Sequence, residues 1–259
     1  MTQTEKRIWL IKYLLSESDR YKGVEIPTDS EEQFNLYRSL VNVRTPSQIS
    51  DEYLRIEDEF LSQENAEKGI TDIADLKPVK DNLYIWQGDI TSLKVDAIVN
   101  AANSQMLGCF VPCHRCIDNC IHTFSGIRLR QKCDEIMQKQ NTPEPTGKAK
   151  ITPAYNLPCK YVIHTVGPIV MYELMENHKE LLASCYEECL KCADENGLSS
   201  IAFCCISTGE FHFPNDEAAQ IAVKTVKEYK NKTNSKIKVI FNVFKDLDRD
   251  IYERILSDN

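Results

Sequence analysis

Short apolar runs that alternate with helical segments from residue 83 onward restrict the fold of this chain more than any other feature. The runs are rich in Val, Ile and Phe, as in strands of a sheet that is covered on both faces. Apolar strands that alternate with helices predict an α/β fold with a mostly buried sheet. We expect strands at 83–86, 96–99, 149–151, 161–164, 200–206 and 237–244, and helices after His122, at 180–195, after Pro214 and through 251–256.

The first eighty residues carry helical patterns only. Apolar side chains recur at helical spacing in residues 4–15. Ser30 lies three residues before Gln33, which is the spacing of a capping box at the start of a second helix. Ser50 is placed to cap a third helix. These patterns predict a small bundle of helices ahead of the α/β region.

Charge and cysteine are unevenly distributed and indicate a domain boundary near residue 80. Residues 1–81 hold 17 acidic and 11 basic residues, against 22 and 20 in the remainder, and all eleven cysteines lie beyond residue 108. Pro78 and mixed polar residues form the connection at 69–82. We therefore expect a helical N-terminal extension at 1–80 and a second domain at 81–259.

Composition excludes several classes of function. A net charge of −8 and a pI of about 5.3 argue against sequence-independent binding of nucleic acid, because such proteins carry a basic face. No apolar run reaches the roughly 18 residues of a membrane span. The odd number of cysteines and the polar N-terminal segment predict a cytoplasmic protein with reduced thiols. We expect neither nucleic acid nor a membrane as a partner, and we expect a monomer.

The loop that follows the strand at 96–99 is crowded with potential metal ligands. A Cys-x4-His-x-Cys spacing supplies two thiolates and an imidazole, which suits zinc, and three ligands leave a fourth position for water or substrate. Two alternatives remain: reduced thiols beside a histidine that bonds nearby backbone, or a closed structural site with Cys113 as fourth ligand. The potential ligands within fourteen residues are Cys109, Cys113, His114, Cys116, Asp118, Cys120 and His122.

Two further loops at predicted strand ends carry polar signals. Residues 207–214 place Ser, Thr and Gly between a buried strand and a helix, an arrangement whose backbone N–H groups can hold a pyrophosphate. An ordinary turn between a strand and a helix has a similar composition. Asp89 follows Gly88 at the end of the first strand, where it either forms the turn or contacts a ligand.

Together these loops resemble those of the macrodomain family, which binds ADP-ribose. The resemblance covers roughly residues 83–256 and implies a three-layer α/β/α fold with a mixed central sheet. The matching motifs are Gly-Asp-Ile-Thr (88–91), Asp-Ala-Ile-Val-Asn-Ala-Ala-Asn (96–103), Thr-Gly-Lys-Ala-Lys-Ile-Thr-Pro-Ala (146–154), Tyr-Val-Ile-His-Thr-Val-Gly-Pro (161–168) and Ile-Ser-Thr-Gly (206–209).

The chain departs from common macrodomains at residues 108–122, where cysteines and histidines replace a glycine-rich loop. This departure and the helical extension resemble the zinc-containing bacterial macrodomains. Members of that subgroup act as protein-ADP-ribose hydrolases. They are often encoded beside a sirtuin-type ADP-ribosyltransferase and a lipoylated carrier protein.

The subgroup resemblance implies a role for each residue of the site. One Zn²⁺ per chain would be held by Cys109, His114 and Cys116. Asp118 and Asn103 would be catalytic, the first as a general base or orienting carboxylate and the second on the hydroxyls of the distal ribose. The roles of Cys113 and His212 stay open. The resemblance implies that ADP-ribose is contacted by Asp89, Ile90, Asn103, Cys120, Ser207, Thr208, Gly209, Glu210, Phe211 and Phe244.

The sequence therefore predicts a zinc-dependent hydrolase. Its expected reaction is the removal of mono-ADP-ribose from modified proteins, from an ester to an acidic side chain, which would reverse a sirtuin-type modification. A lipoylated carrier protein is a possible substrate. Two alternatives use the same site: a reader that binds ADP-ribose without cleavage, and a hydrolase of O-acetyl-ADP-ribose.

Overall fold

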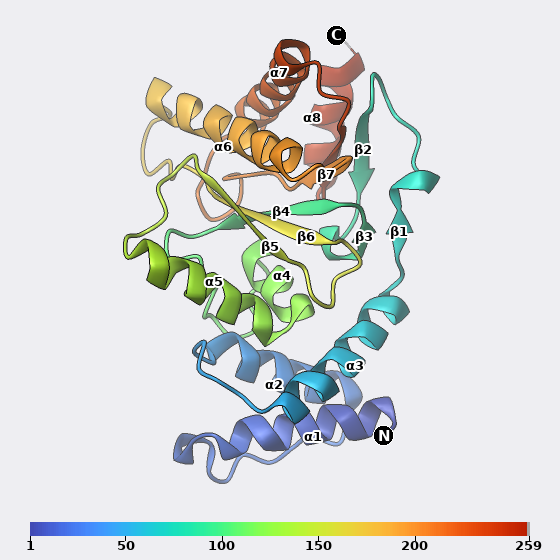
Figure 1. Ribbon diagram of the computed structural model, residues 1–259, viewed down its shortest axis with the longest axis vertical. Helices are drawn as coiled ribbons and strands as arrows, with labels where there is room; N and C mark the ends of the chain where they lie inside the picture. The colour runs from blue at the N-terminus through green and yellow to red at the C-terminus, as the bar shows by residue number, and fades with distance from the viewer. Residues whose placement is uncertain (258–259) are drawn as a thin grey trace.

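A six-stranded sheet forms the centre of the computed structural model, which describes residues 1–257 (Figure 1). Its strand order is β2-β8-β7-β4-β6-β5, and β5 alone runs antiparallel to its neighbour. The central strands are buried on both faces, which explains their uninterrupted apolar sequences. The strands are β2 Leu83–Gln87, β4 Ala97–Ala102, β5 Ala149–Pro153, β6 Tyr161–Val166, β7 Ser200–Phe203 and β8 Lys238–Val243.

Helices cover both faces of this sheet (Figure 1). Below it in that view lie α4 Ile117–Ser125 and α5 Ile127–Gln140. Above it lie α6 Glu176–Glu195, α7 Asn215–Thr233 and α8 Asp246–Ser257. The sheet and these helices share one hydrophobic core. The predicted three-layer α/β/α fold with a mixed sheet is therefore confirmed.

Two predicted boundaries were wrong. The strand at 200–206 ends at Phe203, because the chain then turns and Cys205 O accepts a hydrogen bond from Thr208 N (3.4 Å). The helix expected after His122 begins at Ile117, because the Sγ atom of Cys116 caps it by accepting from Asn119 N (3.4 Å). His122 consequently lies inside α4.

Three helices precede the sheet and form a second hydrophobic core of their own. They are α1 Gln3–Ser16, α2 Ser30–Val43 and α3 Asp51–Lys68. Ser50 caps α3 as predicted, with Oγ accepting from Tyr53 N (3.2 Å). The cap of α2 is Asp29 and not Ser30, because the Asp29 carboxylate accepts from two N–H groups of the first turn.

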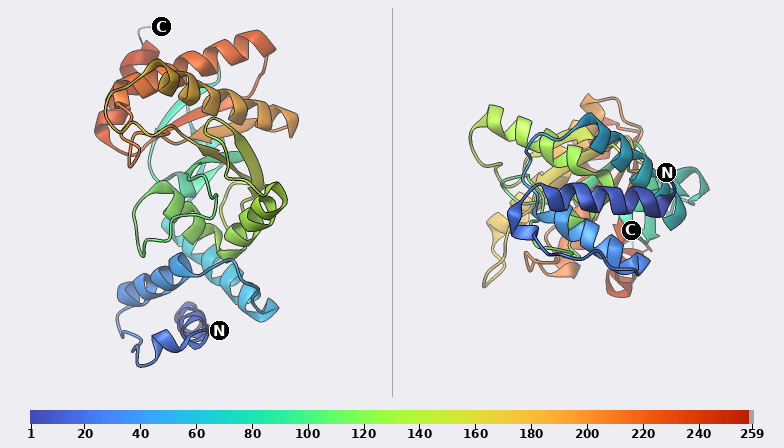
Figure 2. Two further views of the ribbon diagram at one scale, coloured as in Figure 1. Left: turned by 90° about the vertical axis from the view of Figure 1, so that its left-hand side faces the viewer. Right: turned by 90° about the horizontal axis from the view of Figure 1, so that it is seen from below.

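The helical extension packs against α4 and the start of α5, and the left view of Figure 2 shows it next to these helices. The N-terminus lies at this end of the molecule and α8 at the opposite one. A two-stranded parallel ribbon joins β1 Thr71–Asp72 to β3 Leu93–Lys94, so the connection is itself bonded across the expected boundary. The division into 1–80 and 81–259 therefore stays a prediction. Residues 258 and 259 of the second predicted domain lie outside the residues that the structure describes.

Glu57 of α3 is buried where the extension meets α5. Its carboxylate accepts hydrogen bonds from the hydroxyls of Tyr37 and Tyr53 and from Ile127 N at the start of α5. Burial raises the pKa of Glu57 to about 7, although these three donors act in the opposite direction. The junction between the two cores thus contains a polar group.

Among residues 1–257, no helix is both long and apolar enough to cross a bilayer.

Candidate functional site

Cys109, His114 and Cys116 come together in the loop between β4 and α4, residues 103–116, which we call the metal loop. Their Sγ and imidazole nitrogen atoms lie within 4.8 Å of one another, and 3.7 Å separates Cys109 Sγ from His114 Nδ1. Ligand bonds to zinc measure about 2.0–2.3 Å, so one ion can reach all three groups. Burial, with the nearby Cys109 and Asp118, raises the pKa of Cys116 to about 12. A bound cation would stabilise the thiolate and so offset the unfavourable free energy of ionising a buried thiol. The donor set fits zinc.

Cys113 points away from the other three ligands. Its backbone adopts a positive φ of 53°, and its Sγ atom lies 3.3 Å from Asn35 O on α2. Within the described residues, the cluster around His114 has three members and Cys113 is not among them. The closed four-ligand alternative therefore has no support in this arrangement.

Asp118 occupies the first turn of α4, two residues beyond Cys116. The residue is 5% exposed, and its carboxylate accepts a hydrogen bond from Asn100 Nδ2 (2.8 Å), while Asn103 Nδ2 lies 3.4 Å from the second oxygen. Burial raises the pKa of Asp118 to about 6, against the opposing effect of the Asn100 bond. The helix cap is Cys116, so Asp118 is free of that structural role. Two amides thus orient a buried carboxylate beside the metal loop.

A second group of potential ligands, His122, Cys133 and His164, is buried, and His122 Nε2 lies 3.6 Å from Asp118 Oδ1. The Nε2 atom of His164 lies 2.9 Å from Thr152 Oγ1, and burial lowers the pKa of this histidine to about 3. Burial also raises the pKa of Cys133 to about 12. We interpret this group as neutral packing. The His122 ring also packs closely against Gly108. A Cβ added at Gly108 would lie 2.8 Å from that ring, so the metal loop has no room for a side chain there.

The loop between β7 and α7, residues 207–213, which we call the phosphate loop, turns tightly on its own backbone. Phe213 N donates to Ser207 O and His212 N donates to Gly209 O, both at 3.0 Å. Within residues 1–257, the N–H groups of Gly209, Glu210 and Phe211 donate to no other backbone group. Like the buried and unpartnered Ser207 Oγ, they remain available to an anion.

The two loops approach each other at the metal ligands. Glu210 Oε1 of the phosphate loop lies 3.8 Å from His114 Nε2 of the metal loop. Thr208 stays within its own turn, where its hydroxyl donates to Cys205 O (3.0 Å). His114 therefore lies beside the middle of the phosphate loop. His212, with a positive φ of 55°, is exposed and shapes the turn.

Asp89 lies at the far end of β2, where a short 3-10 turn spans Ile90–Ser92. Its carboxylate accepts hydrogen bonds from Thr91 N and from the Nζ atom of Lys68, both at 2.9 Å. Lys68 is the last residue of α3. Burial raises the pKa of Asp89, but the charge of Lys68 and the bonds from Thr91 outweigh it and hold this pKa below its usual value. Phe244 follows β8 and is 74% exposed, so it is not a core residue and its ring is free to stack.

Comparisons with known proteins agree with this geometry. The Macro domain family model matches residues 99–222. A protein of Treponema medium named "Protein-ADP-ribose hydrolase" is 58% identical over 99% of this chain and 100% of its own length. A protein of the same name from Staphylococcus aureus strain MSSA476 is 51% identical over 95% of both chains.

The chain belongs to the macrodomain family. A solved macrodomain of Trypanosoma brucei in complex with ADP-ribose superposes with a TM-score of 0.65 and 28% identity, covering 84% of this chain and 94% of that one. The family predicted from the loop motifs is thereby confirmed.

This macrodomain brings most of the predicted site residues to one edge of its sheet, because the loops after parallel strands open at the same side. Cys120 lies apart from the metal ligands, on α4, where Arg38 of α2 approaches its Sγ atom (3.5 Å). Sequence reasoning missed Lys68 and Arg38, which reach the site from the extension. A polar residue on a solvated helix gives no local signal of such a role.

Proposed function

We propose that this macrodomain removes mono-ADP-ribose from modified proteins and holds one Zn²⁺ per chain with Cys109, His114 and Cys116. The observation that carries the proposal is the convergence of these three donors beside the buried Asp118. The name "Protein-ADP-ribose hydrolase" of the Treponema and Staphylococcus relatives supports the reaction class.

The proposed binding mode uses the loops at the strand ends. The Asp89 carboxylate accepts the amino group of adenine, and the Ile90 N–H bonds the ring. The exposed Phe244 ring stacks on adenine. The phosphates bind to the backbone N–H groups of the phosphate loop, and Cys120 contributes contact area from α4. The distal ribose then lies toward the metal loop, where Asn103 bonds its hydroxyls.

The proposed chemistry is hydrolysis of the ester between the distal ribose and an acidic side chain. When bound, Zn²⁺ supplies a Lewis acid that stabilises negative charge on nearby oxygen atoms. The Asp118 carboxylate takes a proton from the attacking water, while Asn100 and Asn103 hold that carboxylate in place. Water supplies the hydroxyl group for one product and the proton for the other, so the carboxylic acid and ADP-ribose leave separately.

We place this protein in the cytoplasm, as a monomer that reverses a sirtuin-type modification. Support comes from the cysteines, since none of the eleven forms a disulfide within residues 1–257. The sirtuin link and a lipoylated carrier protein as substrate rest on the subgroup resemblance.

The test is release of labelled ADP-ribose from an automodified sirtuin-type transferase, with and without a zinc chelator. We expect release without chelator, loss of release with it, and recovery on adding Zn²⁺. Label that persists equally in both arms would instead establish a reader. A parallel assay with O-acetyl-ADP-ribose measures whether the same site accepts a small ester.

A further inference from the structure

The metal loop has little backbone structure of its own. Within the part of the chain that the structure describes, residues 107–115 make a single backbone–backbone hydrogen bond, from His114 N to Val111 O (3.2 Å). Gly108 and Cys113 adopt positive φ angles of 80° and 53°. Such a segment needs other contacts to hold Cys109 and His114 in place, because ordering each residue costs conformational entropy.

Side chains from outside the loop replace the missing backbone bonds. Asn119, which is 0% exposed, donates from Nδ2 to Val111 O (3.0 Å) and to Cys109 O (3.3 Å). Arg130 of α5 donates from Nε to Leu107 O (2.6 Å). Both act from within the macrodomain and hold the first half of the segment.

The second half is held by α2 of the extension. Asn42, which is 1% exposed, accepts from Cys113 N (2.9 Å) and donates to Thr123 Oγ1 on α4 (3.0 Å). Arg38 donates to His114 O (2.7 Å) and to Asn119 Oδ1 (2.8 Å). The two α2 side chains therefore bond the N–H of Cys113, the residue before the ligand His114, and the carbonyl of His114 itself.

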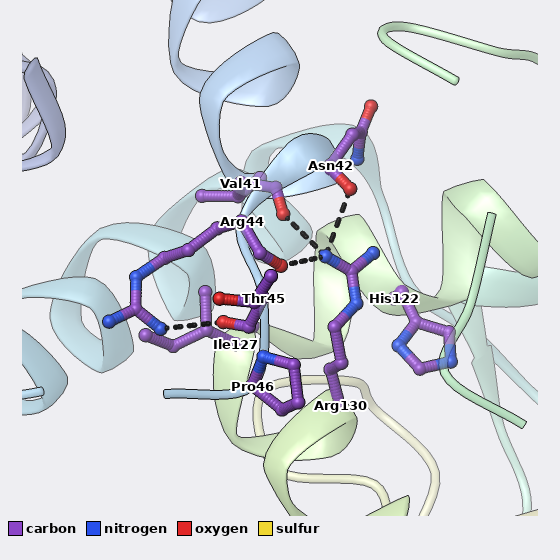
Figure 3. Close-up of a pocket in the computed structure, with 9 residues that line it drawn as sticks. Val41, Asn42, Arg44, Thr45, Pro46, His122, Ile127 and Arg130 are labelled. Carbon is purple, nitrogen blue, oxygen red and sulfur yellow. Dashed lines mark hydrogen bonds between the residues drawn. The ribbon is translucent and has the colours of Figure 1, made fainter. Parts of the chain in front are cut away.

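Arg130 also fixes α2 itself. Its Nη1 atom donates to the carbonyl oxygens of Val41, Asn42 and Arg44 at the end of that helix (Figure 3). These carbonyls have no partner inside the helix, and the helix dipole favours a cation there. Figure 3 shows the guanidinium beside His122, next to a cavity of about 10 Å³. One buried arginine thus joins α2, α5 and the metal loop.

We propose that α2 is part of the metal centre, with Arg38 and Asn42 as positioning residues that set the backbone on both sides of His114. This inference rests on the proposed zinc site and goes beyond it by giving the extension a function. On this proposal the bonds from α2 contribute to ordering the loop, so zinc binding supplies less of the free energy of ordering.

The experiment compares zinc affinity, by competition with a chromophoric chelator, in three variants of the full chain. Arg38→Met removes the donors and keeps the stem, and Asn42→Leu removes both bonds at similar volume. Arg55→Met is the matched control, because Arg55 lies on α3 and, within residues 1–257, its side chain bonds only the surface Glu59. Loss of groups that orient metal ligands costs about 10–100-fold in metal affinity. We expect a loss in that range for Arg38→Met and Asn42→Leu, and none for the control.

Two further readouts separate positioning from general stability. Hydrogen exchange of the Cys113 amide should accelerate in Asn42→Leu, because its bond to Asn42 is lost. Both test variants should lose hydrolytic activity at limiting zinc and regain it in excess zinc. The KM for the modified protein should then equal that of the wild type. ADP-ribose affinity of the metal-free Asn42→Leu protein should stay within about twofold, because, among residues 1–257, the Asn42 side chain bonds no residue of the proposed nucleotide site. Zinc affinities of Arg38→Met equal to the control overturn the inference and leave the proposed function standing. A wild-type chain that binds no zinc overturns both.

Discussion

The metal loop and the phosphate loop lie side by side, yet they are ordered in different ways. The phosphate loop closes on its own backbone, through bonds such as Phe213 N to Ser207 O, and is tied to the segment after β6 by Val170 N to Phe211 O (2.9 Å). The metal loop depends on side chains from α2, α4 and α5.

We infer from this difference that ADP-ribose binding and the proposed zinc binding depend on different structural contacts. The loop expected to hold the phosphates lies within the family fold and needs nothing from the extension. The loop expected to hold the metal bonds through its backbone to α2, which lies outside the residues that the Macro domain model matches. Changes that weaken one loop should therefore spare the function of the other.

Cys116→Ala should produce the largest effect. The variant loses one of the three proposed metal ligands and the cap of α4, so we expect zinc to be lost and turnover to fall at least about 10³-fold. ADP-ribose affinity should change less than about threefold, because the phosphate loop is intact. Metal analysis, turnover and calorimetric binding measure these results. Global unfolding of the variant would indicate a structural metal and contradict the comparison.

Asp118→Ala should affect catalysis next most strongly. Loss of a general base costs about 10²–10⁴-fold in rate, whereas this carboxylate contributes little to binding of the nucleotide. The measurement is turnover on modified protein beside the dissociation constant for ADP-ribose. Similar losses in both quantities would show that Asp118 is a binding residue.

Two glycine substitutions should separate the loops. Gly108→Ala places a methyl group 2.8 Å from the His122 ring at a φ of +80°, so zinc affinity should fall about tenfold while ADP-ribose still binds. Gly167→Ala places one 2.0 Å from Ser207 Oγ, so ADP-ribose affinity should fall about tenfold while zinc is retained. Each variant is the control of the other, and parallel losses of both ligands would refute the separation.

Glu57→Gln tests the junction that holds the extension in place. Burial raises the pKa of Glu57 from 4.5 to about 7, so the folded chain binds this proton more tightly than the unfolded chain. The resulting stability is fully present below pH 4.5 and is lost as the pH rises through about 7. Relative to the variant, the wild-type free energy of unfolding should fall by about 2–3 kcal/mol between about pH 5 and about pH 8. Parallel denaturation profiles would show that Glu57 does not titrate in this way.

The sequence predicted those parts of the molecule that depend on local spacing. Uniformly apolar strands located the sheet, and Ser50 located the start of α3, because both signals act over a few residues. The three metal ligands lie within eight residues, so their convergence needs only one loop. Their roles, and those of the ADP-ribose residues, stay predictions.

The remaining features depend on contacts between distant segments. Arg38 lies 76 residues from His114 and Lys68 lies 21 residues from Asp89, and no local pattern distinguishes these side chains from other polar residues on helix surfaces. The cap of α2 was misassigned because Gln33, expected to complete a capping box, accepts instead from Arg7 of α1. Tertiary packing decided that cap.

The most direct test is the visible absorption spectrum of the Co²⁺-substituted protein during titration with ADP-ribose. Two thiolates and one imidazole should give charge-transfer and intense d–d bands of a low-coordinate site, and these bands should shift and saturate at about one equivalent of ADP-ribose, because one position is open to the distal ribose or water. A spectrum that remains unchanged at saturating ADP-ribose would contradict a three-ligand metal centre at the nucleotide site.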